Sequence, residues 1–298
     1  MADDNKPSPS IVAEWLKYTT GAVHYTQACD GQFDRVYYPN LRVIFHRMVK
    51  GGVAESVNGK DGYYRLVDDS AEPVDWQEVE KHTDSGLILP FDLRKYIFVY
   101  PDTSGIVAGS KSSGKSGLLL RTVALNMNRV NTILLTNLEG GVGMLRDRFD
   151  AMDIEIPKPA PFKVIPVYEH HHDYIKLPNT LYVIDYIDVV DGEFYKIPGY
   201  LKKIDQKLQG LNSNAFIGLQ KPIGRDTAFG KEGTLKNATF YLAMEASANG
   251  TGGKLKIVDA KVPANKKIHP KNMQWTFLFD QESEGTNFLN IQQSYNEE

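Results

Sequence analysis

The sequence predicts an α/β fold in which a mostly parallel, twisted sheet is flanked by helices and follows a small N-terminal α+β domain. Three observations predict it. A Gly/Ser-rich loop at 109–116 lies between an apolar run and a helical segment, and a second apolar run at 181–184 ends in Asp185. Strand and helix patterns then alternate from about residue 87 to residue 280. A chain of 298 residues is long enough for this core and one smaller domain.

The loop itself is a phosphate-binding motif. It fits G-x-x-x-x-G-K-[ST] and reads Gly109, Ser110, Lys111, Ser112, Ser113, Gly114, Lys115, Ser116. Glycines let backbone N–H groups point at anionic oxygens, and the helix that follows adds the positive end of its dipole. We expect Lys115 to neutralise the β- and γ-phosphates and Ser116 to ligate Mg²⁺. Residues from Gly109 to Gly117 are therefore predicted to bind a nucleotide, with ATP and Mg²⁺ as the expected ligands.

Two acidic residues are candidates for the rest of the site. Asp185 ends a strand, and parallel sheets bind ligands at that edge, so Asp185 is expected to hold Mg²⁺. The alternative for Asp185 is a plain strand-end cap. Glu139 follows the strand predicted at 131–137 and is expected to polarise the attacking water, with a solvated loop acid as the alternative. Tyr186 stands where a second glutamate often follows the metal-binding aspartate.

Together these residues resemble the RecA-like ATPases, and within them the branch of DnaB-type replicative helicases and KaiC-like proteins. The resemblance covers roughly residues 87–280 and rests on Glu139, on the Asp185-Tyr186 pair and on the order of the elements. It implies that Gln220 senses loss of the γ-phosphate and that a loop at 221–231 faces DNA. It also implies assembly into a homo-oligomeric ring or filament that acts in replication, recombination or repair.

One departure from this family concerns the arginine finger. Helicases of the branch carry a Lys-x-Arg pair on a late hairpin, and this pair reaches the γ-phosphate bound by the neighbouring subunit. Lys261 matches the lysine, but Pro263 stands in the arginine position. Because such an arginine can be worth a factor of ~10³ or more in turnover, we expect slow or partner-stimulated hydrolysis.

Residues 10–67 are predicted to form a winged-helix-like domain, with helices at 10–19 and 40–50 before a hairpin of strands at 53–57 and 63–67. Between residues 31 and 67, six Lys/Arg residues stand against three Asp/Glu residues. Two interpretations stay open, DNA binding by the second helix and docking of a protein partner. A transcriptional regulator that reads duplex DNA is a further alternative.

The remaining segments are predicted from composition. Residues 1–9 are expected to be disordered, 68–86 to form a linker, and 281–298 to form a flexible acidic tail. The His-rich run 169–173 is interpreted as a polar loop rather than a metal site, because adjacent side chains point in different directions.

Basic side chains on several segments are candidates for DNA contact, with single-stranded DNA favoured for the core. They are Arg42, Arg47, Lys50, Lys60, Lys196, Lys202, Lys203, Lys221, Arg225 and Lys231. The run 195–203 mixes tyrosines with lysines, which suits base stacking but equally suits the start of an amphipathic helix.

Composition excludes several other classes of protein. The single Cys29 allows no internal disulfide and fits a reducing compartment. The polar N-terminus is not a signal peptide, and no apolar run reaches the length of a membrane span. A net charge of −3 argues against a globally basic nucleic-acid coat but leaves local basic patches open. We therefore expect a cytoplasmic protein without a membrane partner.

Overall fold

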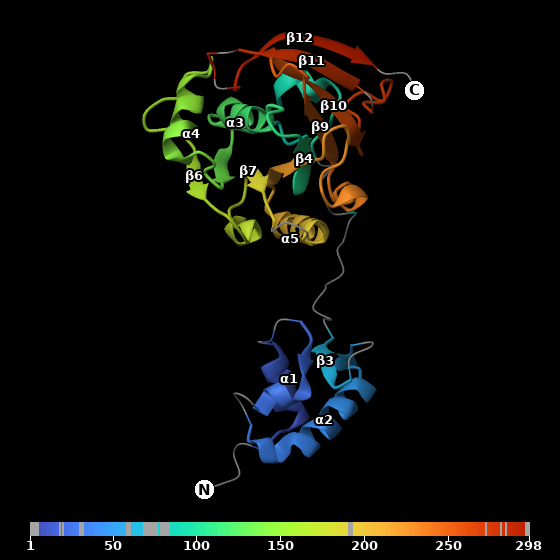
Figure 1. Ribbon diagram of the computed structural model, residues 1–298. Coiled ribbons are helices and arrows are strands. Elements are labelled where there is room, and N and C mark those ends of the chain that lie inside the picture. Colours follow the sequence, from blue (N-terminus) through green and yellow to red (C-terminus); the bar gives the residue numbers. More distant parts are fainter. Residues whose placement is uncertain are drawn as a thin grey trace. The chain divides into compact units, whose positions relative to one another are not determined.

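The computed structural model describes residues 6–17, 19, 21–29, 33–57, 61–67, 77, 84–189, 193–271, 273–280, 282–283 and 285–295. The chain divides into two compact units, Met1–Val79 and Glu80–Glu298 (Figure 1). Lys60, most of the predicted linker 68–86 and residues 1–5 of the predicted disordered segment lie outside the described residues. None of the helices in these ranges is long and apolar enough to cross a membrane.

The described residues of the first unit pack helices α1 and α2 against a three-stranded antiparallel sheet of order β1-β3-β2. The elements in chain order are α1 (Pro9–Lys17), β1 (Val23–His24), the 3₁₀ helices η1 (Tyr25–Cys29) and η2 (Arg35–Tyr37), α2 (Tyr38–Lys50), β2 (Ala54–Ser56) and β3 (Tyr63–Leu66). The predicted apolar face of α2 is buried: Leu41, Ile44, Phe45 and Met48. Helix α2 begins before Asn40, because Pro39 fits a first turn that needs no N–H partner.

The described part of the second unit is built on a nine-stranded sheet of order β12-β11-β10-β9-β4-β8-β7-β5-β6. Neighbouring strands from β9 to β6 run parallel: β9 (Phe240–Ala246), β4 (Thr103–Gly109), β8 (Asn214–Gln220), β7 (Thr180–Ile187), β5 (Asn131–Thr136) and β6 (Lys163–Pro166). The others extend the sheet as an antiparallel meander: β10 (Gly252–Ala260), β11 (Met273–Phe279) and β12 (Phe288–Tyr295). Gly109 pairs with Gln220, and Thr136 with Asp185, so the ends of four strands meet at one edge.

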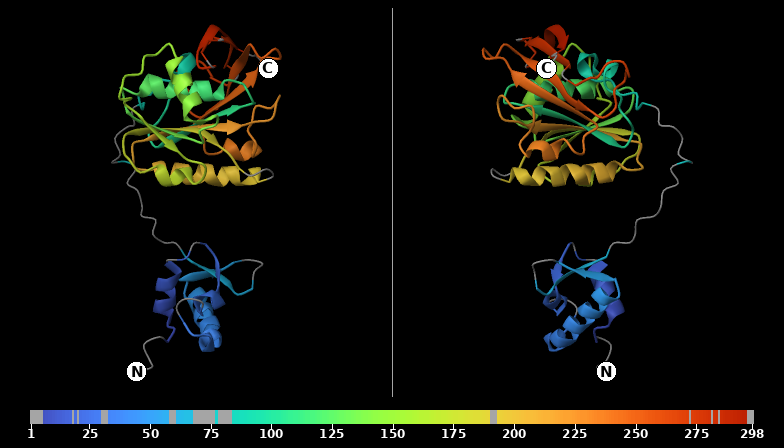
Figure 2. Two further views of the ribbon diagram at one scale, coloured as in Figure 1. Left: turned by 60° about the vertical axis from the view of Figure 1, so that its left-hand side comes forward. Right: turned by 90° about the vertical axis from the view of Figure 1, so that its right-hand side faces the viewer.

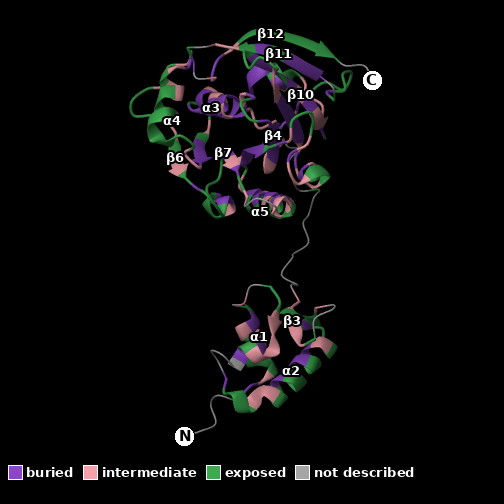
Figure 3. Cartoon of the chain, viewed as in Figure 1, coloured by how far each residue is buried: buried purple, intermediate pink, exposed green. Residues whose placement is uncertain are grey.

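Helices cover both faces of this sheet (Figure 2). Helices α3 (Lys115–Asn126) and α4 (Gly141–Asp150) share one apolar core with η3 (Pro90–Lys95). Helix α5 (Ile197–Leu208) packs on the opposite core, beside η4 (His171–Tyr174), η5 (Phe194–Lys196) and η6 (Lys231–Thr234). Helix α3 is buried along most of its length, whereas α4 has no fully buried residue (Figure 3). The predicted mostly parallel sheet with flanking helices is confirmed.

The prediction of a flexible tail at 281–298 is wrong for residues 288–295. These residues form β12, which pairs with β11 from Phe279 opposite Phe288 to Met273 opposite Tyr295. The sequence pattern did not reveal this strand, because β12 is the edge of the sheet and leaves nearly all of its side chains exposed. The turn before it contains three buried polar residues, Ser283, Thr286 and Asn287.

Candidate nucleotide-binding site

The phosphate loop lies at the edge of the sheet where β4 ends and α3 begins. Gly114 adopts a left-handed conformation with φ of +86° and caps α3, so Lys115 is the first helical residue. The N–H groups of a first helical turn have no partner inside the helix. The hydroxyls of Ser110 and Ser113 are also buried and make no hydrogen bond within the described part of the chain. Unpaired donors at a helix N-terminus suit the oxygens of a nucleotide's phosphates.

The expected metal-binding oxygens meet just beneath this loop. Ser116 Oγ donates to Asp185 Oδ1 at 3.0 Å, and Lys115 Nζ lies 3.5 Å from the same carboxylate oxygen. Asp185 is only 7% exposed, so this contact is sheltered from bulk water. Lys115 Nζ also lies 4.0 Å from the centre of the Tyr186 ring. Hydroxyl and carboxylate oxygens are the protein ligands that Mg²⁺ prefers, so Ser116 and Asp185 fit that ion.

The charge of Lys115 depends on its surroundings. Burial is the largest influence and lowers the pKa of the Lys115 ammonium, whereas the Asp185 and Glu139 carboxylates raise it. The guanidinium of Arg148 acts in the same direction as burial and lowers the pKa of Lys115 further. An anionic ligand beside Lys115 would favour its charged form. The electrostatics of the site therefore favour a negatively charged occupant.

A cavity of about 920 Å³ opens over these residues. All of the predicted nucleotide-binding residues, 109–117, line it, together with Glu139 and Gln220. Asp185 lies below the cavity wall, in contact with Ser116. The volume is near the upper end of the ~300–1,000 Å³ that small-molecule pockets span. The fold thus brings the predicted catalytic and nucleotide-binding residues to one site.

Other residues of the cavity wall were not predicted from the sequence. They are Gly140, Met144, Arg148, Tyr186, Gly250, Thr251, Phe279, Asp280 and Gly285. Gly140, Met144 and Arg148 are spaced by four residues and therefore share one side of the α4 segment, a signal that the sequence did contain. Phe279 and Gly285 carry no comparable signal, because they reach the cavity only through pairing of the C-terminal strands.

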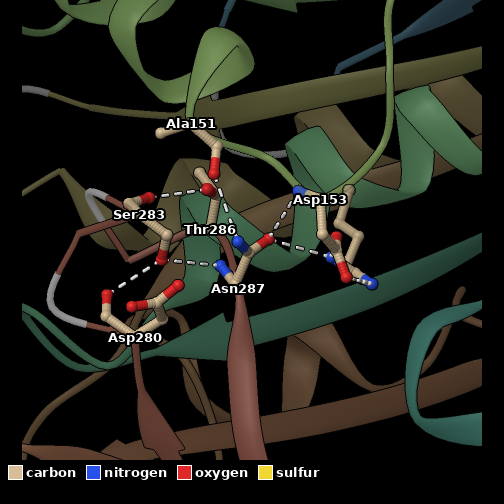
Figure 4. A network of polar contacts seen from close by, with 7 residues as sticks. Ala151, Asp153, Asp280, Ser283, Thr286 and Asn287 are labelled. Atoms are coloured by element: carbon tan, nitrogen blue, oxygen red, sulfur yellow. Dashed lines mark hydrogen bonds and ion pairs between the residues drawn. The ribbon is translucent and has the colours of Figure 1, made fainter.

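The C-terminal turn at 280–287 closes one side of the cavity, and Asn287 holds it in place (Figure 4). Asn287 Oδ1 accepts hydrogen bonds from Asp153 N and Arg121 Nη1, both at 3.2 Å, and its Nδ2 donates to Ala151 O at 3.1 Å. Ser283 Oγ accepts from Asn287 N at 3.1 Å. These bonds tie the turn to α3 and to the segment after α4.

Helix α3 approaches this turn closely at Gly117. A Cβ atom at Gly117 would lie 2.1 Å from the carbonyl oxygen of Gly285, which no real side chain tolerates. A Cβ at Gly114 would likewise lie 2.7 Å from the Phe279 ring. The glycines of the phosphate loop therefore serve the C-terminal turn as well as the loop conformation.

The predicted DNA-binding side chains separate into exposed ones and internally paired ones. The exposed ones are Arg42, Arg47, Lys50, Lys202, Lys203, Arg225 and Lys231. Lys221 is buried and forms an ion pair with Glu245, which contradicts its assignment to a DNA-facing loop. The physical reason is that Lys221 still belongs to the sheet edge, where its N–H donates to Gly109 O at 3.1 Å.

The run 195–203 has the geometry of an amphipathic helix start. Ile197 and Leu201 are buried under α5, and Lys202 and Lys203 face solvent. Lys196 pairs with Glu193 at 2.6 Å, so part of the positive charge of this run is already neutralised.

The late hairpin that carries Lys261 and Pro263 is bonded to its own unit. Lys261 Nζ donates to the carbonyl oxygens of Lys236 and Asn237, at 3.0 and 3.4 Å. Pro263 bridges Ile97, and backbone hydrogen bonds join Phe98 to Val262 and Ala264 to Tyr96 on either side. In this conformation the hairpin is held against residues 96–98.

The His-rich run forms a tighter cluster than its sequence predicts. One ligand atom each of His170, His172 and Asp173 lies within 4.8 Å of the others, because a left-handed His170 precedes the 3₁₀ turn η4. Burial lowers the pKa of His172, and Lys203 and Lys207 of α5 lower it further. Because those lysines place positive charge beside the cluster, we retain the polar-loop interpretation.

A phosphate loop after the central strand β4, a carboxylate at the end of β7 and this strand order define the fold of the RecA-like P-loop ATPases. Among solved structures, the chain is similar to a KaiC-like protein, PH0186, from the archaeon Pyrococcus horikoshii OT3, with 14% identity and a TM-score of 0.51 over 71% of this chain and 99% of that one. It is also similar to the ATPase domain of a helicase (14%, TM-score 0.52, 70% and 90%) and to the RadB recombinase (13%, TM-score 0.47, 64% and 92%). No known family profile and no curated protein sequence matches it. The predicted RecA-like fold is confirmed, and at these identities the likeness concerns the fold alone.

Proposed function

We propose that this protein is an ATPase that couples Mg²⁺-dependent ATP hydrolysis to DNA binding as a homo-oligomer. The observation that carries the proposal is the Ser116–Asp185 contact beneath a cavity lined by Lys115 and by unpaired donors. A cation, two metal-binding oxygens and free N–H and O–H groups together match a nucleoside triphosphate with its metal ion. The fold shared with the helicase ATPase domain is consistent with this chemistry.

Each residue of the site has a role in the proposed reaction. Lys115 and the first turn of α3 bind the phosphate oxygens and neutralise their charge. Mg²⁺ supplies further charge stabilisation when bound, and Ser116 and Asp185 would hold it. Glu139, exposed at the cavity, orients the attacking water and accepts its proton. Gln220, at the end of β8, is positioned to report loss of the γ-phosphate to the loop that follows it.

Exposed basic side chains support the DNA-binding part of the proposal. Helix α2 presents Arg42, Arg47 and Lys50 to solvent and carries no Asp or Glu. The element order of the first unit, with α2 followed by the β2–β3 hairpin, is consistent with a winged-helix-like domain in which α2 enters a DNA groove. Lys202, Lys203, Arg225 and Lys231 are the corresponding exposed candidates on the ATPase core.

A second candidate function is a slow nucleotide-dependent switch that docks a protein partner through residues 10–67. The observation in its favour is the hairpin of Lys261 and Pro263, which lacks the arginine and is bonded to residues 96–98. Without a group supplied in trans, hydrolysis would be slow. A switch needs only that the two nucleotide states differ in affinity for the partner.

Turnover of ATP by the full chain, with and without single-stranded DNA, separates these functions, with Lys115→Ala as the blank. Stimulation by DNA that is absent in the variant supports the coupled ATPase. Tight ATP binding with turnover that DNA leaves unchanged contradicts the coupling and favours the switch. A mobility shift of single-stranded DNA that weakens steeply with salt would give independent support for DNA binding.

A further inference from the structure

Arg148 is a half-buried arginine in the wall of the nucleotide cavity. It forms no ion pair or hydrogen bond with any residue in the described ranges. Arg146 lies on the same helix but pairs with Asp150 at 3.1 Å and is 66% exposed. A guanidinium that is partly withdrawn from water normally has an anionic partner, so the cavity must supply one.

The position of Arg148 directs it to the phosphates. Gly140, Met144 and Arg148 share one side of α4, and all three line the cavity. Helical side chains lean toward the N-terminus of their helix, which places the guanidinium on the Glu139 side of the cavity. It is close enough to Lys115 for the two like charges to interact. Two cations that face one cavity repel each other until a polyanion binds between them.

The usual source of a second positive charge is not at hand in this chain. Pro263 occupies the place of the finger arginine, and Lys261 donates to the carbonyls of Lys236 and Asn237. A planar guanidinium can bind two phosphate oxygens at once, a geometry that an ammonium cannot offer. Arg148 is the residue with that chemistry in the cavity wall among the described residues.

We infer that Arg148 contacts the γ-phosphate of bound ATP and stabilises its transition state from within the same subunit. The inference rests on the proposed ATPase function. Water attacks the γ-phosphorus, the bond to the β–γ bridging oxygen breaks with its electron pair passing to ADP, and the proton of the water passes to Glu139. Arg148 donates hydrogen bonds to the γ-phosphoryl oxygens throughout and transfers no proton.

The test compares Arg148→Ala and Arg148→Lys with Arg146→Ala in the full chain. For Arg148→Ala we expect kcat at saturating Mg²⁺ and ATP to fall by ~10²–10³, and Arg148→Lys to recover only part of it. Affinity for ATP should fall at least ~10-fold while affinity for ADP, which lacks the γ-phosphate, stays within about threefold. Retained ADP binding also verifies that the variant folds. Arg146→Ala should resemble the unchanged chain.

A mixing experiment separates action within a subunit from action between subunits. Arg148→Ala and Glu139→Gln proteins are combined, so that an arginine acting in trans would restore active sites at their interfaces. We expect no recovery of turnover, and recovery would overturn the intrasubunit contact. Equal losses of ATP and ADP affinity with unchanged kcat would overturn the γ-phosphate contact itself. If the unchanged chain binds ATP but does not hydrolyse it, the proposed ATPase fails, and the comparison of ATP with ADP affinity still decides the contact of Arg148.

Discussion

The hydroxyl of Ser116 donates to Asp185 Oδ1 across 3.0 Å, which joins the first turn of α3 to the end of strand β7. Strand β8 lies between β4 and β7, so this contact spans the sheet edge at the point where the phosphate loop begins. A hydroxyl already turned toward a buried carboxylate needs little rearrangement to share a cation with it. The metal-binding pair is therefore organised before any nucleotide binds.

The first prediction concerns this pair. Asp185→Asn keeps the shape of the side chain but removes the charge that attracts Mg²⁺. We expect the gain in ATP affinity that Mg²⁺ confers to fall by ~10–100-fold, with metal-free affinity little changed. Titration of a fluorescent ATP analogue in Mg²⁺ and in EDTA measures both values. Asp188→Asn, an exposed acid three residues later, is the control. An unchanged Mg²⁺ dependence in Asp185→Asn would remove Asp185 from the metal site.

Glu139 provides the second prediction, because binding and chemistry should separate there. Glu139→Gln removes the group that accepts the proton of the attacking water, so kcat should fall by ~10²–10⁴. The Kd for ATP should stay within about threefold, since the phosphates contact other residues. Steady-state turnover and equilibrium binding check the two parts. Glu155→Gln, at another exposed acid, should leave both unchanged. Full activity in Glu139→Gln would identify Glu139 as a solvated loop acid.

The third prediction tests the contact between α3 and the C-terminal turn. Gly117→Ala places a Cβ 2.1 Å from the Gly285 carbonyl oxygen and must displace one of the two segments. We expect the free energy of unfolding to fall by about 1–3 kcal/mol and nucleotide affinity to fall with it. Urea denaturation measures the first effect.

Gly199→Ala is the matched control for that substitution. Gly199 also lies in a helix, α5, and its added Cβ would meet nothing within 4 Å. Alanine there should stabilise the protein by about 0.4–1 kcal/mol. If both variants gain stability, the turn does not press on α3 in solution.

The fourth prediction concerns Asp205 of α5. Burial raises the pKa of Asp205 to about 6, although Ser104 Oγ donates to its carboxylate at 2.6 Å and opposes that rise. Because the folded-state pKa lies above the ordinary value of 3.8, the folded chain binds the extra proton, and stability falls as pH rises from about 4 to about 6. Asp205→Asn is neutral throughout. It should exceed the original protein in stability by about 1–2 kcal/mol at pH 7.5.

Chemical denaturation at two pH values checks this sign. At pH 3.5 the original Asp205 is mostly protonated when folded, so the advantage of Asp205→Asn should shrink toward zero. A stability difference of the same size at both pH values would show that titration of Asp205 is not its cause.

Much of the nucleotide site follows from short stretches of sequence. The phosphate loop depends on glycines and a lysine within eight residues, and Asp185 follows a run of apolar residues typical of a buried strand. Lys221 shows the limit of such reasoning. Its place after a strand suggested a mobile basic loop, but the partner that buries it, Glu245, comes from another strand. Charge in the sequence does not reveal pairing across a sheet.

The sequence alone determined the class of fold, the phosphate loop and the acids at the strand ends, because these depend on neighbours in the chain and on periodic burial. Only the tertiary structure decided that residues 288–295 form an edge strand, that Asn287 holds the C-terminal turn against α3, and that Arg148 faces the nucleotide cavity. Such contacts join residues brought together by strand pairing and helix packing. An exposed edge strand and a lone arginine leave no periodic pattern in the sequence from which their partners could be deduced.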